Sequence, residues 1–126
     1  MAMELLNHYL YVQGQWLPGQ PDSLKAQKAV SLNGAGLRVH ETSRSGVALL
    51  SAVGAPLAAY GDAEVYLKIT FTSGVFEYLS APLRTPIEFA GVSELELNIL
   101  YLVGNAACTS VRYSALFNAH CVFERI

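Results

Sequence analysis

The chain has 126 residues, a length that fits one folding unit, and a net charge of −2 from eight basic and ten acidic side chains. Hydrophobic residues make up 52% of it and charged residues only 14%, whereas about 25% is usual for a soluble domain. The scattered basic residues form no stripe that could neutralise phosphates, which argues against nucleic-acid binding, and the low charge indicates surface covered by other protein. We therefore expect a single β-rich domain over residues 1–126, bound to protein partners.

No secretory signal or membrane span is expected from the sequence. Residues Met1 to Glu4 lack the basic segment and apolar stretch of a signal peptide. The longest nearly uncharged run, residues 46–60, is too short for a bilayer, which needs about 20 apolar residues. The two cysteines, Cys108 and Cys121, are too few for a disulfide framework and are expected to be reduced and buried. These features predict a protein that stays in the cytoplasm where it is made.

The first half of the chain gives mixed signals of secondary structure. Glu4 to Val12 alternates and is rich in aromatic residues, which predicts a strand. Residues 22–32 are ambiguous, with a short capped helix as one interpretation. Leu37 to Glu41 predicts a short strand and residues 42–46 a polar loop. The run 46–60 fits either one and a half helical turns or a buried strand.

The second half is clearer. Glu64 to Thr72 alternates strictly between apolar and polar residues, and a tight turn then leads into Val75 to Leu79, which predicts a hairpin. Ser93 to Val103 keeps one apolar face, but the face that begins with glutamates ends in Leu100 and Leu102, as expected where a second surface covers a strand. Further strands are predicted over Ile87 to Ala90, as a short edge strand, Ser110 to Phe117, and Ala119 to Ile126.

Seven to nine short strands separated by turns predict a mainly-β fold. We expect a single-domain β-sandwich or barrel of the jelly-roll or Greek-key kind, with at most one or two short helices. The alternative is an α+β arrangement with helices at 22–32 or 46–54.

The residue types that carry catalysis or bind metal do not form a recognisable motif. Glu94 and Glu96 share a strand face about 6.5–7 Å apart, a spacing that suits paired carboxylates but equally a solvated sheet face. None of the histidines is at a ligand spacing from another, and metal sites normally have paired ligands. We therefore expect no enzyme, cofactor or metal. The residues tested as metal ligands were His8, His40, His120, Glu41, Cys108 and Cys121.

In composition the chain resembles small viral structural subunits, which are β-rich, poor in lysine, rich in Ala, Ser, Gly and Leu, and apolar at both ends. The resemblance implies a non-enzymatic virion protein, such as a phage capsid decoration (cement) protein or a small tail or baseplate subunit. It would form a homo-oligomer, with a trimer among the expected states, and would contact other subunits of the particle. The main contacts are expected from residues 1–12, 46–60 and the C-terminal segment. The residues predicted at this interface are Tyr9, Tyr11, Trp16, Leu49, Leu50, Leu100, Leu102, Phe123 and Ile126.

Two other functions compete with assembly. A carbohydrate- or ligand-binding β-module would use Trp16 and the nearby tyrosines to stack on its ligand. A small barrel enzyme would use Glu94 and Glu96, or the histidines. For Trp16 there is also a purely structural interpretation, in which its ring closes one end of the sandwich.

Overall fold

The computed structural model describes residues 2–54, 63–80, 82–83, 85–104 and 107–126. All regular structure in these ranges is β, and no helix in them is long and apolar enough to cross a membrane. The mainly-β prediction is confirmed. The strands are β1 (Glu4–Trp16), β2 (Ser23–Val53), β3 (Ala63–Phe71), β4 (Phe76–Ser80), β5 (Ile87–Leu102) and β6 (Ser110–Arg125).

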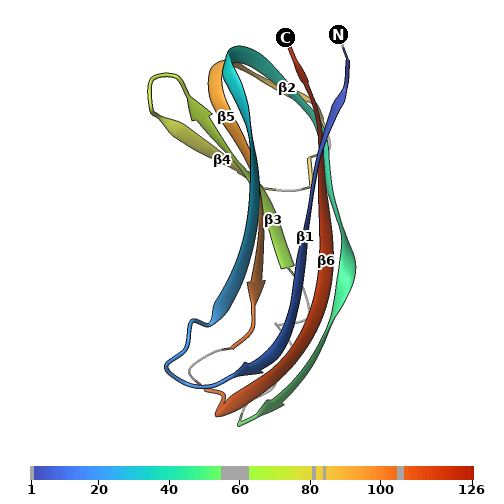
Figure 1. The fold of residues 1–126 in the computed structure, drawn as a ribbon, viewed down its shortest axis with the longest axis vertical. Coiled ribbons are helices and arrows are strands. Elements are labelled where there is room, and N and C mark those ends of the chain that lie inside the picture. Colours follow the sequence, from blue (N-terminus) through green and yellow to red (C-terminus); the bar gives the residue numbers. More distant parts are fainter. Residues whose placement is uncertain (1, 55–62, 81, 84, 105–106) are drawn as a thin grey trace.

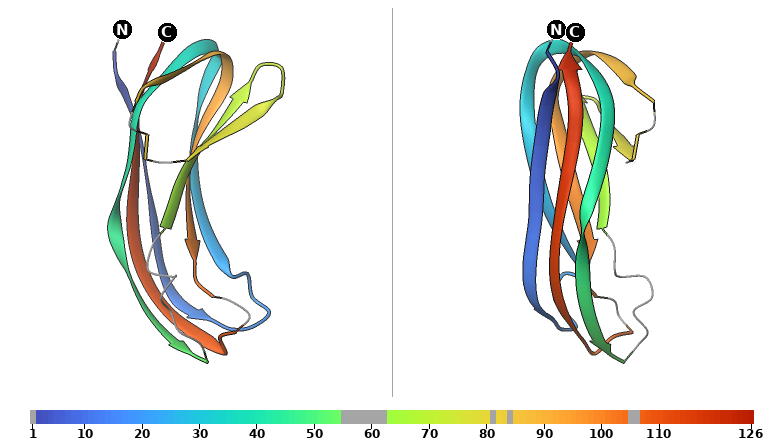
Figure 2. Two further views of the ribbon diagram at one scale, coloured as in Figure 1. Left: turned by 180° about the vertical axis from the view of Figure 1, so that it is seen from behind. Right: turned by 90° about the vertical axis from the view of Figure 1, so that its right-hand side faces the viewer.

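The six strands form one antiparallel sheet in the order β1-β6-β2-β5-β3-β4, folded over into two layers (Figure 1). The long strand β2 belongs to both layers. Its residues Ser23 to Val39 pair with β5, and its residues Leu37 to Val53 pair with β6. The two layers face each other along the length of the molecule, and both termini lie side by side at one end (Figure 2). The result is a jelly-roll-like sandwich.

Strand β2 passes between the layers through a series of irregularities. The register shifts between Ser31 and Ala35, between Ala35 and Leu37, and again between Val39 and Glu41. Asn33 and Gly34, within the first shift, have φ values of 52° and 87°, a region that Gly and Asn adopt most easily. Bulges of this kind bend a strand without ending it. The chain can therefore change layers while its hydrogen-bonded pairing continues.

The core fills the space between the inner faces of the two layers. The predicted apolar face of β5, Leu95, Leu97, Ile99 and Tyr101, is fully buried. The Tyr101 ring lies 5.2 Å from the ring of Phe117 on β6, so these two side chains join the layers. Burial raises the pKa of Tyr101 to about 12, and among the described residues its hydroxyl has no hydrogen-bond partner.

Trp16 is buried at the end of β1, with only 5% of its surface exposed. Its indole Nε1 donates a hydrogen bond to the backbone oxygen of Gln20 at 3.2 Å. Gly104 packs against the ring so closely that a Cβ there would lie 2.2 Å from it. Trp16 therefore closes one end of the sandwich, as its structural interpretation proposed.

In the first half one prediction is wrong and two open assignments are decided. Residues 42–46, predicted as a polar loop, form strand, and the ambiguous segment 22–32 is strand from Ser23 onward rather than a capped helix. From 46 to Val53 the chain is also strand, so the helical alternative fails, while 55–60 lie outside the described residues. The physical reason is shared: each segment pairs along its length with a strand distant in sequence, and this pairing outweighs the local preference.

The segment Ile87 to Ala90, predicted as a short edge strand, is the first part of the longer strand β5. Here β5 pairs with β2, whereas its pairing with β3 begins only at Val92. Gly91, with φ 62°, lies between Ala90 and Ser93, where the sequence predicted a break between two separate strands. Joining such segments through bulges explains why the described residues form six strands instead of the seven to nine expected.

Candidate functional site

The outer face of the β1–β6–β2 layer carries a group of exposed apolar side chains. The strand register places Tyr11, Leu116 and Val47 in one row across the three strands. On one side of this row lie Tyr9, Asn118 and Ser45, and on the other Gln13, Ser114 and Leu49. These three consecutive rows contain no acidic or basic side chain and no histidine. We call Tyr9, Tyr11, Val47, Leu49 and Leu116 the outer patch.

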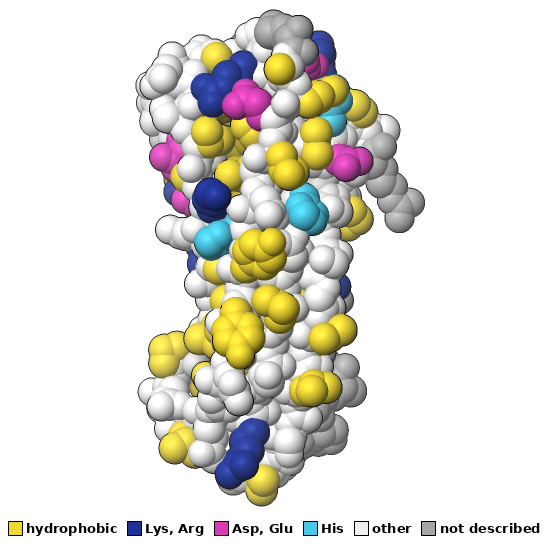
Figure 3. All heavy atoms as spheres, turned by 45° about the vertical axis from the view of Figure 1, so that its right-hand side comes forward, with side chains coloured by type: hydrophobic (Ala, Val, Ile, Leu, Met, Phe, Trp, Pro, Cys, Tyr) yellow, Lys and Arg dark blue, Asp and Glu magenta, His cyan; other side chains and the backbone are white. Residues whose placement is uncertain are grey.

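The outer patch is open to solvent. Val47 and Leu49 have exposed fractions of 72% and 73%, Tyr11 of 69%, Tyr9 of 56% and Leu116 of 49%. Figure 3 shows hydrophobic side chains down the middle of this face, whereas charged side chains gather mainly toward the end that carries the termini. Scattered exposed apolar residues are ordinary, but a contiguous uncharged group marks an interaction surface.

Of the residues predicted at an interface, Tyr9, Tyr11 and Leu49 belong to the outer patch, and the others do not. Leu50 points to the opposite side of β2 and packs against the core. Trp16 and Phe123 are core residues, with 5% and 2% exposure, and offer no surface to a partner in this fold.

The remaining predicted residues lie outside this face. Leu100 and Leu102 are on the outer face of β5, in the other layer, where Leu100 is half-buried and Leu102 is 38% exposed. Ile126 is 38% exposed and exchanges two backbone hydrogen bonds with Gly36. The residues predicted individually did not include Leu116, nor Val47, which lies in the segment 46–60 that was expected to make contacts. The alternation of β2 and β6 could have found them once strand rather than helix was known over 46–53.

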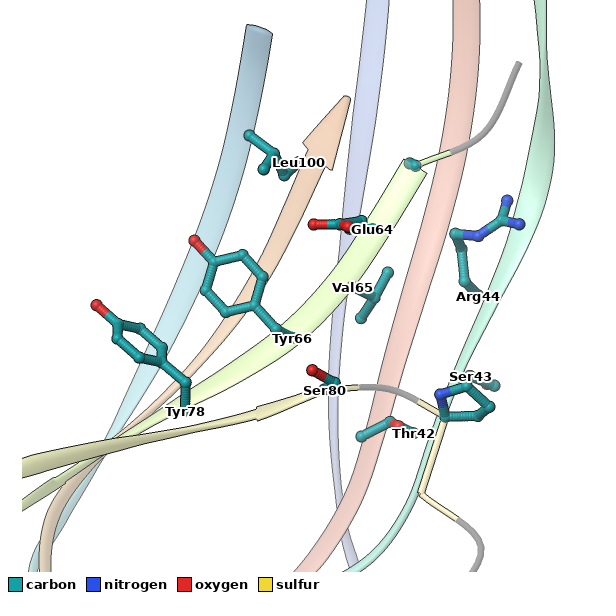
Figure 4. Close-up of a pocket in the computed structure, with 11 residues that line it drawn as sticks. Thr42, Ser43, Arg44, Glu64, Val65, Tyr66, Tyr78, Ser80 and Leu100 are labelled. Atoms are coloured by element: carbon teal, nitrogen blue, oxygen red, sulfur yellow. The ribbon is translucent and has the colours of Figure 1, made fainter. Parts of the chain in front are cut away.

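A second feature is a cleft of about 820 Å³ where the free edge of β2 faces β3 across the two layers (Figure 4). Thr42, Ser43 and Arg44 line it from β2, and Ala63 to Tyr66 line it from β3, with Tyr78 from β4. The rings of Tyr66 and Tyr78 meet edge to face at 5.7 Å. The volume falls in the range of about 300–1,000 Å³ that is common for small-ligand sites.

Positive charge lies close to the aromatic groups near this cleft. The Lys25 ammonium is 5.6 Å from the centre of the Tyr66 ring, and a hydrogen bond to Tyr66 raises the pKa of Lys25. The Arg44 guanidinium lies 5.3 Å from the centre of the Phe117 ring. Aromatic rings with adjacent cations and the exposed Glu64 carboxylate give the cleft both stacking and polar groups.

A chain of ionic contacts holds β2 where it crosses between the layers. The Arg38 guanidinium donates two hydrogen bonds, from Nε to the Glu88 carboxylate on β5 at 2.6 Å and from Nη1 to the Glu124 carboxylate on β6 at 2.5 Å. His40 Nε2 lies 3.0 Å from the same Glu124 carboxylate. These contacts, from His40 first and then Arg38, lower the pKa of Glu124. Because every member has a partner, we assign the cluster to the fold.

The residues considered as candidates for catalysis do not line the cleft. Glu94 is exposed on the outer face of β5 and Glu96 is half-buried there, and neither lines the cleft described above. Cys121 is fully buried, which raises its pKa to about 12 and keeps the thiol protonated at neutral pH, unlike a nucleophilic cysteine. Among the described residues no three His, Cys, Asp or Glu side chains are grouped as a metal site.

No protein-family model and no curated protein sequence matches the chain. Among solved structures, the VP2 subviral particle of infectious bursal disease virus aligns with a TM-score of 0.36 and 10% identity, over 98% of this chain and 37% of that chain. The Gt strain of the same virus gives a TM-score of 0.37 at 10% identity, with 98% and 38% covered. The chain thus spans little more than a third of these proteins, and TM-scores this low establish neither a shared fold nor a shared function.

Proposed function

We propose that this protein is a non-enzymatic assembly subunit of a virion, which acts as a single domain and binds copies of itself and other subunits of the particle. The observation that carries the proposal is the outer patch, an uncharged apolar surface spanning three neighbouring strands. A jelly-roll-like sandwich is compatible with this role but does not select it, since capsid proteins and lectins both use such folds.

The mechanism would be passive burial of this surface. Complete burial of one large apolar side chain contributes about 1.5–3 kcal/mol, and the five members of the outer patch are between 49% and 73% exposed. A modest contact of this kind becomes strong in an oligomer, because once one subunit has bound the particle the contacts of the linked subunits form intramolecularly, at a high effective concentration. The low charge of the chain, 14%, also suits a surface that is repeatedly covered.

In its finer form, the proposal is a phage capsid decoration protein or a small tail or baseplate subunit that stabilises the particle. Sedimentation velocity of the purified protein tests self-association, and electron microscopy of particles with and without the protein tests attachment. We expect oligomers in solution and density from the protein at regular positions on the particle. A highly soluble monomer that binds no particle would contradict the proposal.

The cleft supports a second candidate, a carbohydrate- or ligand-binding module. In this fold the stacking residues would be Tyr66 and Tyr78, because Trp16 is buried. A glycan array, followed by titration calorimetry of any sugar that binds, tests it. Saturable binding that Tyr66→Ala removes, by a protein that stays monomeric, would favour this candidate over assembly.

A further inference from the structure

Strand β1 is an edge strand without the features that normally protect an edge. It pairs with β6 along all 13 residues without a register shift, and no other described strand pairs with its second side. Between Leu5 and Trp16 it contains no proline and no Asp, Glu, Lys or Arg residue, and its one imidazole, that of His8, is half-buried. A long, regular and uncharged edge leaves a row of backbone N–H and C=O groups available to another strand.

The other edges of the sheet are protected. β4 is only five residues long. The first half of β2 carries Lys28, which is exposed although it lies opposite the buried Leu97, and an inward-facing charge of this kind discourages pairing. The second half of β2 carries the charged side chains Glu41 and Arg44, and charge on an edge strand discourages pairing. The start of β5, Ile87 to Ala90, has no β3 partner, but it is only four residues long and includes the charged Glu88. Within the described residues, β1 is therefore the edge that lacks such protection.

We propose that two copies of this chain associate by antiparallel pairing of their β1 strands, with the two-fold axis at Leu10. Leu10 is the central residue of Glu4–Trp16, so this register pairs the whole strand with its copy. It places Tyr9 opposite Tyr11 of the second copy, and Tyr11 opposite its Tyr9. The sole charged group, Glu4, stays at the end of the pairing and is held by Arg125 at 2.8 Å.

The strand is self-complementary in this register, which is why a second copy is the partner. Residues that face outward meet residues that face outward, so aromatic side chains form cross-strand pairs, a favourable combination in sheets. The two β1–β6–β2 layers become one continuous sheet, and their outer patches merge into one larger apolar face. Lys28 on each copy keeps the other layers from joining in the same way.

The register predicts a specific charge pattern that can be tested. In Tyr9→Lys/Tyr11→Lys, like charges lie directly opposite each other at two symmetric positions. In Tyr9→Lys/Tyr11→Glu, opposite charges face each other at the same two positions. Both tyrosines are more than half exposed, at 56% and 69%, so each variant should keep the fold, which circular dichroism verifies. Gln27→Lys/Ala29→Lys is the matched double-lysine control, at two exposed positions of β2 in the other layer, outside the outer patch.

Sedimentation velocity over a range of concentrations measures self-association. We expect the double-lysine variant to dissociate about tenfold more readily than the lysine–glutamate variant, and the control to self-associate through β1 as the wild type does. Slower amide exchange in β1 at high protein concentration provides a second measurement. Equal weakening of both charge variants, greater weakening of the control, or a monomeric wild type would overturn the proposal.

The inference extends the proposed function by naming one of its contacts, and the two can fail separately. A pair of copies that follows the charge pattern but binds no particle would support pairing through β1 and contradict the virion role. Particle binding by a protein whose association ignores the charge pattern would do the reverse.

Discussion

Leu49 and Leu50 are neighbours on β2 that face opposite sides of one layer, so a matched pair of substitutions separates assembly from folding. Leu49 is 73% exposed in the outer patch, whereas Leu50 is half-buried and packs against the core. Introducing aspartate at each position gives the same chemical change in two different environments.

The expected magnitudes follow from this difference. Complete burial of a leucine contributes about 1.5–3 kcal/mol, so the exposed share of Leu49 leaves about 1–2 kcal/mol to a partner, roughly 5- to 30-fold in dissociation constant. Leu49→Asp should change the free energy of unfolding of the monomer by no more than about 0.5 kcal/mol. Leu50→Asp places a carboxylate against apolar neighbours and should cost about 2–4 kcal/mol of stability.

Urea unfolding followed by the fluorescence of Trp16, the only tryptophan, measures stability. Particle binding measures assembly through the outer patch on the same samples, and sedimentation velocity measures whether the pairing of copies through β1 is kept. We expect Leu49→Asp to lose assembly as a folded protein, and Leu50→Asp to lose stability first. If Leu49→Asp assembled like the wild type, the outer patch would not be the contact surface. If it unfolded the monomer, this face would belong to the fold.

Three further predictions concern stability and the carboxylates. Gly46→Ala should destabilise the fold by about 2 kcal/mol or more, because its Cβ would lie 2.1 Å from a β6 backbone oxygen. Gly74 also has a positive φ but open space around it, so Gly74→Ala should cost about 1 kcal/mol in the same urea titration. The folded state lowers the pKa of Glu124, so the ionised carboxylate stabilises the fold at any pH above 4.5, the ordinary pKa of a glutamate. This contribution is lost as the pH falls through the lowered pKa, and Glu124→Gln should flatten that part of the stability–pH curve. Replacing Glu94 and Glu96 together by glutamine should change the free energy of unfolding by about 0.5 kcal/mol or less, and a much larger loss would assign them a role beyond a solvated face.

Much of the second half of the fold could be predicted from alternation alone. Val65, Leu67 and Ile69 on β3 were expected on one face, and all are buried. The pattern succeeded there because each strand has one face in the core and one that is largely polar, so period-two alternation reports its environment directly. The apolar end of β5 was also visible, through Leu100 and Leu102.

The pattern failed along β2, where one strand serves two layers. Its neighbours change from β5 to β6 near Leu37, and the bulges that allow this change shift the alternation each time. Within a local window, such a strand looks like a possible helix, a short strand and a loop in succession. The ionic cluster was equally hidden, because Arg38 meets partners 50 and 86 residues away. Contacts of this kind depend on topology that no local motif encodes.

Alternation also determines how the function of the terminal segments can be tested. On β1, Leu6 and Leu10 are buried in the core, while Tyr9 and Tyr11 between and beyond them are exposed. Deleting residues 1–6 would therefore remove a core side chain and the Glu4–Arg125 ion pair together with any contact surface. Loss of assembly in such a deletion could result from unfolding alone. Core packing and partner contact alternate residue by residue along β1. Only substitutions confined to its outward face can therefore show whether a partner binds there.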